Sequence, residues 1–474
     1  MPGKKIIREP AKDIPVFSEC DILVVGGGPA GCAAAASASR IGAETIVLER
    51  YGHLGGMATG GLVLWLDRMS DWQGRQVITG FADEMLDRLP TDAVLGAPKY
   101  SWGSRDPALV EYWKDRASAF NGVVTMSPTY DLEMMKLAYF DAMEAERIKL
   151  LLHCWVAAPI QEDNEIKGVV FESKAGRKAI LARAIIDASG DGDVFAAAGE
   201  SFDNDIFQQS WHHQVNVAWL WAGVDMERFL KFKNENKETF QSLTAQAKSE
   251  FKDVDAWGYQ TSVLGMPHVM PRNDVCLFMS PKLEGFSCLD IEDLTEVEYV
   301  SRRIMMKMLY FYRRHIPGFE DAWIMLTAPQ IGVRHSRRLN GVKKMTHADW
   351  KQGIIHADEI GVSPPPNTKN ANVSIPLGCL IPRKLENLLV AGRNLSSDAV
   401  THNFMRLIPQ CWQTGQAAGV AAAVAVNANT RLQDADIAVI QKHLKDQGVY
   451  LSAQETIPEN GEQPSDRKVT ARTT

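Results

Sequence analysis

The stretch Val24-Val-Gly-Gly-Gly-Pro-Ala-Gly31 decides the fold that this sequence predicts. The apolar run 21–25 leads into it and indicates a buried strand. The Ala-rich segment 30–41 follows it and has a helical pattern that ends at Gly42. A second buried strand is expected at 45–48. These segments form a strand–helix–strand unit of about 30 residues, with the glycine-rich turn between the first strand and the helix.

Three glycines of this turn, Gly26, Gly28 and Gly31, have the G-x-G-x-x-G spacing of a dinucleotide-binding motif. The first glycine permits the tight turn, the second lets the backbone approach a pyrophosphate, and the third lets helix and strand pack closely. Glu49 ends the second strand about 20 residues further on, where a carboxylate binds the adenosine ribose. A carboxylate there disfavours the 2′-phosphate of NADP, which leaves FAD or NAD.

Three further stretches favour FAD over NAD. Arg50-Tyr-Gly-His-Leu-Gly-Gly-Met-Ala58 resembles the Gly-Gly loop that carries the pyrophosphate-to-flavin region in flavoproteins of the glutathione-reductase and fumarate-reductase type. Ile185-Ile-Asp-Ala-Ser-Gly-Asp-Gly-Asp193 resembles the segment that closes their β-meander. Leu389-Val-Ala-Gly-Arg-Asn394 takes the place of their C-terminal FAD motif, whose helix N-terminus faces the flavin ring.

Together with Gly332-Val-Arg-His-Ser-Arg-Arg-Leu-Asn-Gly341, these stretches resemble the FAD-dependent oxidoreductase family placed beside the fumarate-reductase flavoproteins. The resemblance extends from residue 1 to about residue 430 and implies FAD, bound non-covalently, more firmly than it implies a reaction. The motifs and the resemblance give these cofactor-binding residues: Gly26, Gly28, Pro29, Ala30, Gly31, Glu49, Arg50, His53, Gly55, Gly56, Met57, Ala58, Val156, Ala188, Gly190, Gly392 and Arg393.

Two departures from related flavoproteins narrow the class of enzyme. The C-terminal motif is Gly392-Arg393, where disulfide reductases and aromatic hydroxylases have Gly-Asp. A second complete G-x-G-x-x-G is absent from the sequence, because Phe195 stands where the third glycine after Gly190 and Gly192 belongs. A stable nicotinamide site is therefore not expected.

The fold class expected is α/β: a Rossmann-like FAD-binding domain, with a parallel sheet and a β-meander, and an inserted α+β substrate domain. The meander is expected at 150–157, 165–173 and 179–187, after a helix at 131–148 that Asp131 can cap. The expected division is an N-terminal arm at 1–19, the FAD-binding domain at 20–60, 121–200 and 371–445, the substrate or cap domain at 61–120 and 201–370, and a polar tail at 446–474.

Candidate catalytic residues lie on the C-terminal side of these motifs. His402 and Arg406 follow the Gly-Arg motif and precede the helix expected to point at the flavin, which makes His402 an acid/base candidate. Arg334 and Arg338 lie in the stretch that the resemblance places near the active site, where arginine can hold a carboxylate or stabilise an oxyanion. For each of them, a structural role is the alternative.

Two other histidines carry weaker hypotheses. His213 belongs to an adjacent pair on an expected strand, so only one ring of the pair can face a pocket, and the spacing is not that of metal ligands. His53 is expected to be a loop residue near the flavin or pyrophosphate. Covalent attachment to the flavin is the less favoured alternative, because succinate dehydrogenases place that histidine further ahead of the Gly-Gly pair.

The composition excludes several classes of partner. The net charge of −7 gives no support for nucleic-acid binding, and no apolar run reaches the roughly 18 residues of a membrane span. The seven cysteines are scattered without a C-x-x-C pair, so no metal site of that type is expected. With no signal-peptide pattern at the N-terminus, a cytoplasmic location is expected.

The expected activity is hydride transfer between a small organic substrate and flavin N5. The sequence leaves open whether the enzyme is a dehydrogenase, an oxidase or a C=C reductase. It also leaves open whether O₂, a quinone or a redox protein accepts the electrons, and whether the chain forms a homo-oligomer. A flavin hydroxylase and a flavin-binding protein without turnover are the alternatives.

Overall fold

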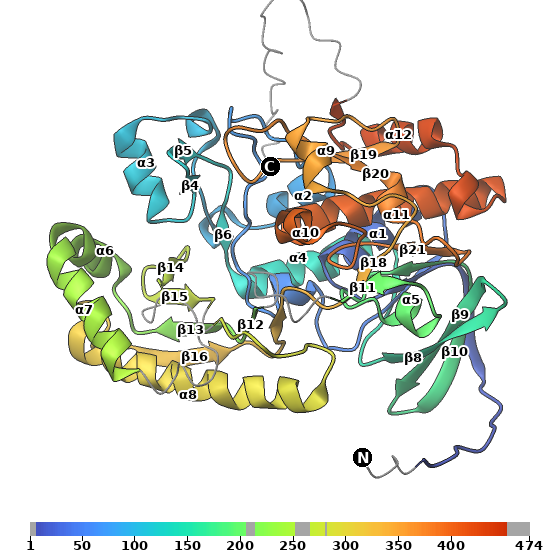
Figure 1. Ribbon diagram of the computed structural model, residues 1–474, viewed down its shortest axis with the longest axis horizontal. Coiled ribbons are helices and arrows are strands. Elements are labelled where there is room, and N and C mark those ends of the chain that lie inside the picture. The colour runs from blue at the N-terminus through green and yellow to red at the C-terminus, as the bar shows by residue number, and fades with distance from the viewer. Residues whose placement is uncertain (1–5, 205–213, 252–265, 280–281, 453–474) are drawn as a thin grey trace, which may run out of the picture.

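The computed structural model describes residues 6–204, 214–251, 266–279 and 282–452 (Figure 1). The chain forms a large lobe built on one sheet and a smaller lobe that projects from it. The N-terminal strands and the last long helices, which are far apart in sequence, share the large lobe (Figure 1). None of the helices in the described ranges is both long enough and apolar enough to cross a membrane.

The sheet of the large lobe has the order β7-β2-β1-β10-β9-β8, and β21 also pairs with β10. The pairs that involve β1, β2, β7 and β21 are parallel, whereas β8, β9 and β10 form an antiparallel meander. Its strands are β1 (Val16–Val25), β2 (Thr45–Leu48), β7 (Lys149–Leu151), β8 (Trp155–Glu162), β9 (Glu165–Ser173), β10 (Gly176–Asp187) and β21 (Leu388–Val390). The predicted α/β fold with a parallel sheet and a meander is confirmed.

Two details of the predicted strands differ from the structure. The expected strand 150–157 is divided between β7 and β8, because His153 turns the chain with a φ of 57°. The expected arm 1–19 ends earlier, because Val16 already pairs with Ala179 of β10. Both differences depend on which partner strand lies alongside, which the local pattern does not show.

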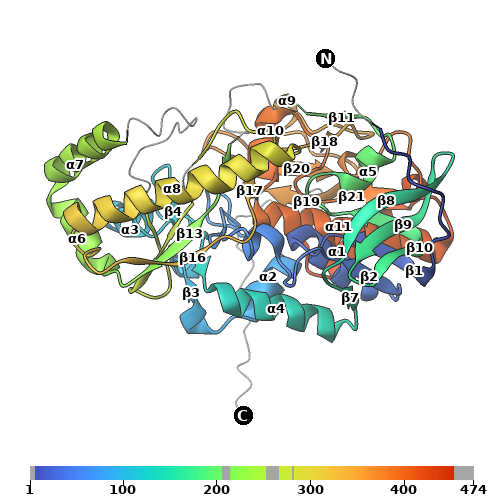
Figure 2. The same cartoon turned by 90° about the horizontal axis from the view of Figure 1, so that it is seen from below.

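Helices α1 (Pro29–Ser39) and α11 (Ile408–Ala428) pack directly against each other (Figures 1 and 2). Gly415 and Gly419 of α11 face Ala30 and Ala34 of α1. A Cβ atom on Gly415 would lie 2.1 Å from the carbonyl oxygen of Ala30, and one on Gly419 would lie 2.0 Å from that of Ala34. The two backbones therefore approach so closely that only glycine fits on α11.

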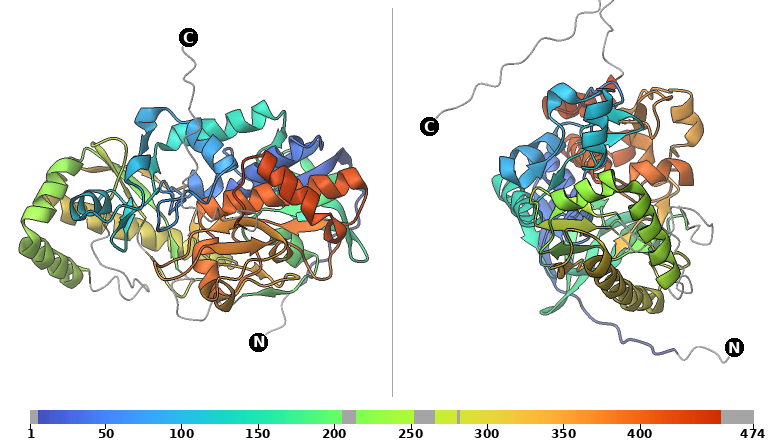
Figure 3. Two further views of the ribbon diagram at one scale, coloured as in Figure 1. Left: turned by 90° about the horizontal axis from the view of Figure 1, so that it is seen from above. Right: turned by 90° about the vertical axis from the view of Figure 1, so that its left-hand side faces the viewer.

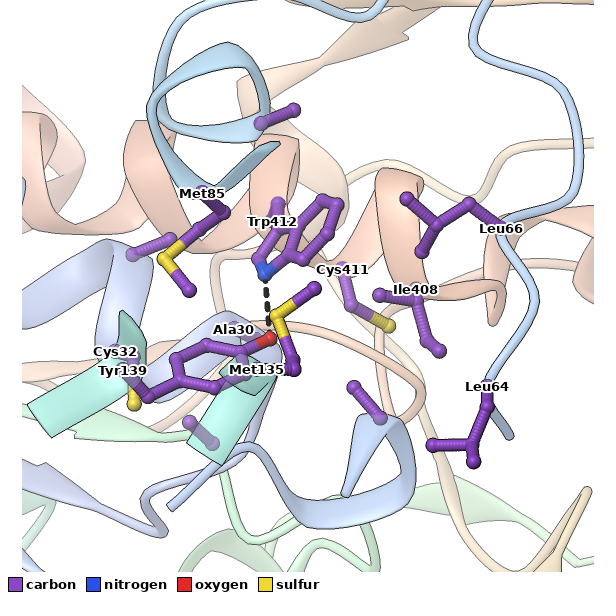
Figure 4. Close-up of a cluster of buried hydrophobic side chains, with 14 of the residues drawn as sticks. Ala30, Cys32, Leu64, Leu66, Met85, Met135, Tyr139, Ile408, Cys411 and Trp412 are labelled. Carbon is purple, nitrogen blue, oxygen red and sulfur yellow. Dashed lines mark hydrogen bonds between the residues drawn. The ribbon is translucent and has the colours of Figure 1, made fainter. Parts of the chain in front are cut away.

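A buried cluster ties this helix pair to α4 (Leu132–Ala145), the helix predicted from Asp131 (Figure 4). The indole Nε1 of Trp412 donates a hydrogen bond of 2.8 Å to the hydroxyl of Tyr139. Asp131 caps α4 by accepting hydrogen bonds from the amides of Glu133 and Met134. Figure 4 shows the Tyr139 ring beside Cys32 of α1, so α1, α4 and α11 share one core.

The smaller lobe is an antiparallel sheet of order β14-β15-β13-β16 with helices packed on it. Long helix α8 crosses one face of the molecule in Figure 2, and in the view from above in Figure 3 the light-green helices α6 and α7 lie at the end remote from the meander. The elements are β13 (Trp219–Ala222), β14 (His268–Val269), β15 (Val275–Phe278), β16 (Trp323–Thr327), α6 (Met226–Glu235), α7 (Lys237–Glu250) and α8 (Ile291–His315).

Aromatic side chains fill the core of the smaller lobe. Trp221 of β13 lies with its ring centroid 4.4 Å from that of Phe278 and 5.3 Å from that of Tyr312. Trp219 stacks on Phe278 at 5.3 Å with nearly parallel rings. These packed rings form a buried aromatic core that stabilises the smaller lobe.

Gly419→Ala tests the close contact between α1 and α11. Alanine favours a helix over glycine by about 1 kcal/mol, but the added Cβ collides with α1, so we expect the free energy of unfolding in urea to fall by about 1–3 kcal/mol. The control Ser242→Ala, on the exposed side of α7, should change it by no more than about 0.5 kcal/mol. A Gly419→Ala protein as stable as the parent would show that the helices do not touch at this point.

Candidate active site

A single cavity of about 830 Å³ brings together segments that are far apart in the sequence. This volume lies toward the upper end of the range for small-molecule sites. Both lobes contribute to its lining, which is made by Gly26, Gly28, Pro29, Ala30, Glu49, Arg50, Tyr51, Gly56, Met57, Val63, Trp65, Asp67, Ala188, Ser189, Gly190, Asn216, Met266, His268, Met279, Lys282, Gln330, Gly332, Val333, Arg334, Ala391, Gly392, Arg393, Asn403, Arg406, Leu407, Ile408 and Cys411.

The glycine-rich turn after β1 forms one wall of this cavity. Gly26 has a φ of 101°, and a Cβ there would lie 2.5 Å from the carbonyl oxygen of Ala188, so a side chain cannot be accommodated. Gly28 precedes α1 and provides no side-chain cap, which leaves amides of the first turn without a capping side chain. A helix N-terminus of this kind binds phosphate.

Glu49 is fixed at the end of β2 by two backbone amides. Its carboxylate accepts hydrogen bonds of 2.7 Å from Gly27 N–H and 2.9 Å from Tyr51 N–H. Burial raises the pKa of Glu49, and these hydrogen bonds together with nearby Arg50 partly offset that effect. The carboxylate thus lines the cavity beside the glycine-rich turn, where the ribose of a dinucleotide is expected.

A smaller hollow of about 50 Å³ adjoins the cavity and shares Gly26, Glu49 and Arg50 with it. Val156 lines this hollow, and the guanidinium of Arg50 lies 5.1 Å from the Trp155 ring. The prediction that the backbone of Val156 lies near the adenine concerns this hollow.

Arg393 lies on the opposite side, in the loop between β21 and α10 (Ala399–Met405). Its Nη2 is 2.9 Å from a carboxylate oxygen of Asp191, in the loop after β10. Burial alone would raise the pKa of Asp191, but Arg393, the Ser336 hydroxyl and Arg50 together hold it below its ordinary value. This ion pair fixes two of the predicted FAD motifs to each other.

A second helix terminus reaches the cavity at the start of α11. Leu407 precedes the helix without a side-chain cap, and Leu407 and Ile408 both line the cavity. The N-terminal partial positive charge of α11 therefore faces the same space as that of α1. These two helix N-termini fit a cofactor that has a pyrophosphate at one end and, at the other end, a ring that gains negative charge on reduction.

Most of the predicted FAD residues line this cavity or the adjoining hollow. Gly31, His53, Gly55 and Ala58 do not line either, but support residues that do. A Cβ on Gly31 would lie 1.8 Å from the Gly26 carbonyl oxygen, and one on Gly55 would lie 2.6 Å from the Tyr139 ring. These glycines permit close packing behind the site.

A family model described as FAD dependent oxidoreductase matches residues 21–444. The chain belongs to this family. It is an oxidoreductase with FAD as its cofactor, and the residues of the cavity fit that cofactor at the pyrophosphate, ribose and flavin ends.

Several solved structures are similar to this FAD-dependent oxidoreductase at low identity. A geranylgeranyl bacteriochlorophyll reductase-like protein from Thermoplasma acidophilum matches with a TM-score of 0.46 and 14% identity, over 90% of this chain and 83% of that one. A p-nitrophenol 4-monooxygenase from Pseudomonas putida matches with a TM-score of 0.40 and 12% identity, over 90% of this chain and 84% of that one. An anhydrotetracycline hydroxylase from Streptomyces rimosus matches with a TM-score of 0.43 and 12% identity, over 91% of this chain and 66% of that one.

Cationic side chains gather where the smaller lobe meets the cavity. Val215 of β12 (Val215–Asn216) pairs with Val333 of β17 (Gly332–Val333) on one side and with Leu283 on the other, which brings Arg334 and Lys282 to the cavity. Burial lowers the pKa of Lys282 to about 8 and that of Arg334 to about 10. Gln214 orients Arg334 by accepting a hydrogen bond of 3.4 Å from its Nη1.

Arg406 reaches the same space from the large lobe, at the end of α10. Burial and the neighbouring Arg334 and Arg393 lower the pKa of Arg406 to about 9, so its guanidinium remains charged at neutral pH. Asp67 lines the cavity as well. Sequence reasoning missed Asp67 and Lys282, although Asp67-Arg68 is a charged pair within the apolar run 62–69 and gave a local signal.

The structure places the other predicted catalytic residues elsewhere. His402 is fully buried and does not line the cavity; its Nε2 lies 2.9 Å from the carbonyl oxygen of Arg393, and burial holds its pKa well below the ordinary value. Arg338 is also buried outside the lining, 3.8 Å from a carboxylate oxygen of Asp203. His213 lies outside the described residues. These positions do not support direct proton transfer by His402.

His53 lies behind the cavity wall, where its Nε2 is 3.2 Å from the side-chain nitrogen of the lining residue Gln330. We therefore expect acid precipitation to release all flavin into the supernatant and leave a colourless pellet. The measurement is the visible absorption of both fractions. A yellow pellet would show a covalent link and contradict this expectation.

Replacement of Glu49 tests the ribose end of the site. Glu49→Gln removes the charge that strengthens a hydrogen bond to the ribose, so we expect the dissociation constant for FAD to rise about 10-fold or more. The value can be measured by titrating the apoprotein and following the quenching of flavin fluorescence. Exposed Glu44→Gln, five residues earlier, serves as the control. Equal affinity in both variants would remove Glu49 from cofactor binding.

Proposed function

We propose that this FAD-dependent enzyme transfers a hydride between flavin N5 and a small organic substrate that carries a carboxylate. One observation carries the proposal: Arg334, Arg406 and Lys282 line the same cavity as the dinucleotide motifs. The large lobe would hold FAD and the smaller lobe would supply most of the substrate surface.

Three cations that line the cavity, Arg334, Arg406 and Lys282, have lowered pKa values. Burial is the first cause of the lowered pKa of all three side chains, and repulsion from neighbouring arginines adds to it for Lys282 and Arg406. A carboxylate bound among them would relieve both effects by pairing with partly desolvated cations. Arginine suits this task because its planar guanidinium can bind both carboxylate oxygens.

FAD, when bound, supplies the two-electron chemistry, and the protein supplies binding, orientation and charge stabilisation. The N-terminus of α11 would stabilise negative charge on the reduced cofactor. His402 would act as a positioning residue, because its contact with the Arg393 carbonyl holds the loop that leads from β21 to α10. Arg338 would act in the same way through Asp203.

Both directions of hydride transfer are compatible with this site. Oxidation requires a substrate C–H bond next to an oxygen or nitrogen, and reduction requires either the corresponding C=O or C=N bond or a C=C bond conjugated to a carbonyl group. In either direction the arginines hold the carboxylate and fix which carbon faces the flavin.

An anaerobic screen tests the proposal. The holoenzyme is mixed with a library of neutral alcohols, amines and carboxylic acids, and loss of the flavin colour is recorded. We expect only acids to bleach it in the direction of oxidation; with reduced enzyme, only oxo acids or unsaturated acids should restore the colour. Bleaching by neutral compounds alone would overturn the proposal, and NAD(P)H-driven oxygen uptake with a hydroxylated product would indicate a monooxygenase.

Arg406→Met provides the matching mutational test. Loss of a charged hydrogen-bonding partner should raise the substrate concentration for half-maximal bleaching by about 10-fold to 100-fold. The FAD content should remain that of the parent. Arg105→Met, at an exposed loop position, is the control and should leave the titration unchanged. An Arg406→Met protein that titrates like the parent would show that this guanidinium does not bind the substrate.

A further inference from the structure

Asp67 is a carboxylate in the cavity that the proposed carboxylate site does not use. It lies in the segment that follows the 3₁₀ turn η1 (Gly56–Ala58), and 23% of its side chain is exposed. Its oxygens accept no hydrogen bond from any residue in the described ranges. The nearest cationic atom is Nε of its neighbour Arg68, at 3.6 Å, which is too long for a hydrogen bond.

Arg68 is held away from the cavity by other contacts. Its guanidinium carbon lies 4.5 Å from the centre of the Trp72 ring, and its backbone amide donates to the Ser127 hydroxyl at 3.1 Å. Arg68 is buried and does not line the cavity. The Asp67 oxygens are therefore available to a ligand, while Arg68 balances part of their charge.

Arg406 lines the same cavity and makes no side-chain hydrogen bond within the part of the chain that the structure describes. Burial raises the pKa of Asp67, while Arg68 and Arg406 lower it, so the two charged groups influence each other. They nevertheless form no direct ion pair with each other. A gap thus separates an available carboxylate from an available guanidinium, and a ligand with complementary groups can bridge it.

The charges around the gap select the group that faces Asp67. Among the residues that the structure describes at this part of the cavity, the cations Arg334, Arg406 and Lys282 outnumber the carboxylate of Asp67, so these side chains together carry net positive charge. A substrate ammonium group would be repelled by that charge, whereas a hydroxyl group is neutral and can donate a hydrogen bond to Asp67. The site therefore favours a hydroxyl and a carboxylate on the same small molecule.

We propose that the substrate is a hydroxy acid and that Asp67 is the catalytic base for its hydroxyl proton. This inference rests on the proposed function. In the oxidation, the C–H bond of the alcohol carbon breaks and its hydride passes to FAD, the O–H proton passes to the Asp67 carboxylate, and a C=O bond forms. Reduction of the corresponding oxo acid is the reverse, with Asp67 as the acid.

A pair of unreactive acids tests the hydroxyl contact without turnover. 2-Hydroxy-2-methylpropanoate and 2,2-dimethylpropanoate differ by one hydroxyl in place of a methyl group, and neither has a C–H bond at the reacting carbon. Each is titrated into the holoenzyme, and the dissociation constant is obtained from the change in the visible flavin spectrum. We expect the hydroxy acid to bind about 10-fold more tightly to the parent enzyme.

Asp67→Ala should reduce this preference to about equal affinity for the two acids. Asp67→Asn, which keeps the shape of the side chain, should weaken the preference and slow flavin reduction by a reactive hydroxy acid about 100-fold or more. Asp87→Asn, at an exposed position of α2 (Phe81–Asp87), should behave like the parent. FAD content and thermal stability of each variant are measured alongside.

The outcomes separate this inference from the proposed function. If neither acid perturbs the flavin of the parent enzyme, the carboxylate site itself is wrong and both proposals fall. If both acids bind but the parent shows no preference, or the preference persists in Asp67→Ala and Asp67→Asn, only the role of Asp67 is overturned. The parent titration decides this even if a variant fails to fold.

Discussion

The close contact between α1 and α11 is the constraint on which the site depends. Gly415 and Gly419 let the backbone of α11 lie against that of α1, with no room for a Cβ atom between them. At this separation both helix N-termini open onto one cavity. A wider crossing would move the start of α11 away from the glycine-rich turn, and the two partial positive charges would no longer face a single dinucleotide.

The buried carboxylates of the large lobe extend this arrangement. Asp187 ends β10 and accepts hydrogen bonds from the amides of Ser189, Val194 and Phe195, which fixes the loop that follows the strand. Asp191 in that loop then pairs with Arg393. Because Asp187 and Asp191 both have partners, these two buried carboxylates are not left unsatisfied.

The cations that line the cavity come from both lobes. Arg406 comes from the large lobe, while Arg334 and Lys282 come from segments that meet through the pairing of Val215 with its two neighbours. The three cations are brought together by the fold at a cost in desolvation and mutual repulsion. The proposed carboxylate substrate would offset that cost.

The sequence alone indicated a dinucleotide-binding unit, because Gly26, Gly28 and Glu49 lie at fixed local spacing within a single strand–helix–strand unit, and the stretches that resemble flavoprotein motifs then favoured FAD over NAD. Gly415 and Gly419 show the same local spacing, but their partner helix lies almost four hundred positions earlier, and only packing reveals it. The tertiary structure alone placed Asp67 and Arg406 on the lining of one cavity and removed His402 from that lining. Those side chains act across contacts between distant segments, and a local pattern carries no information about which distant side chain it will meet.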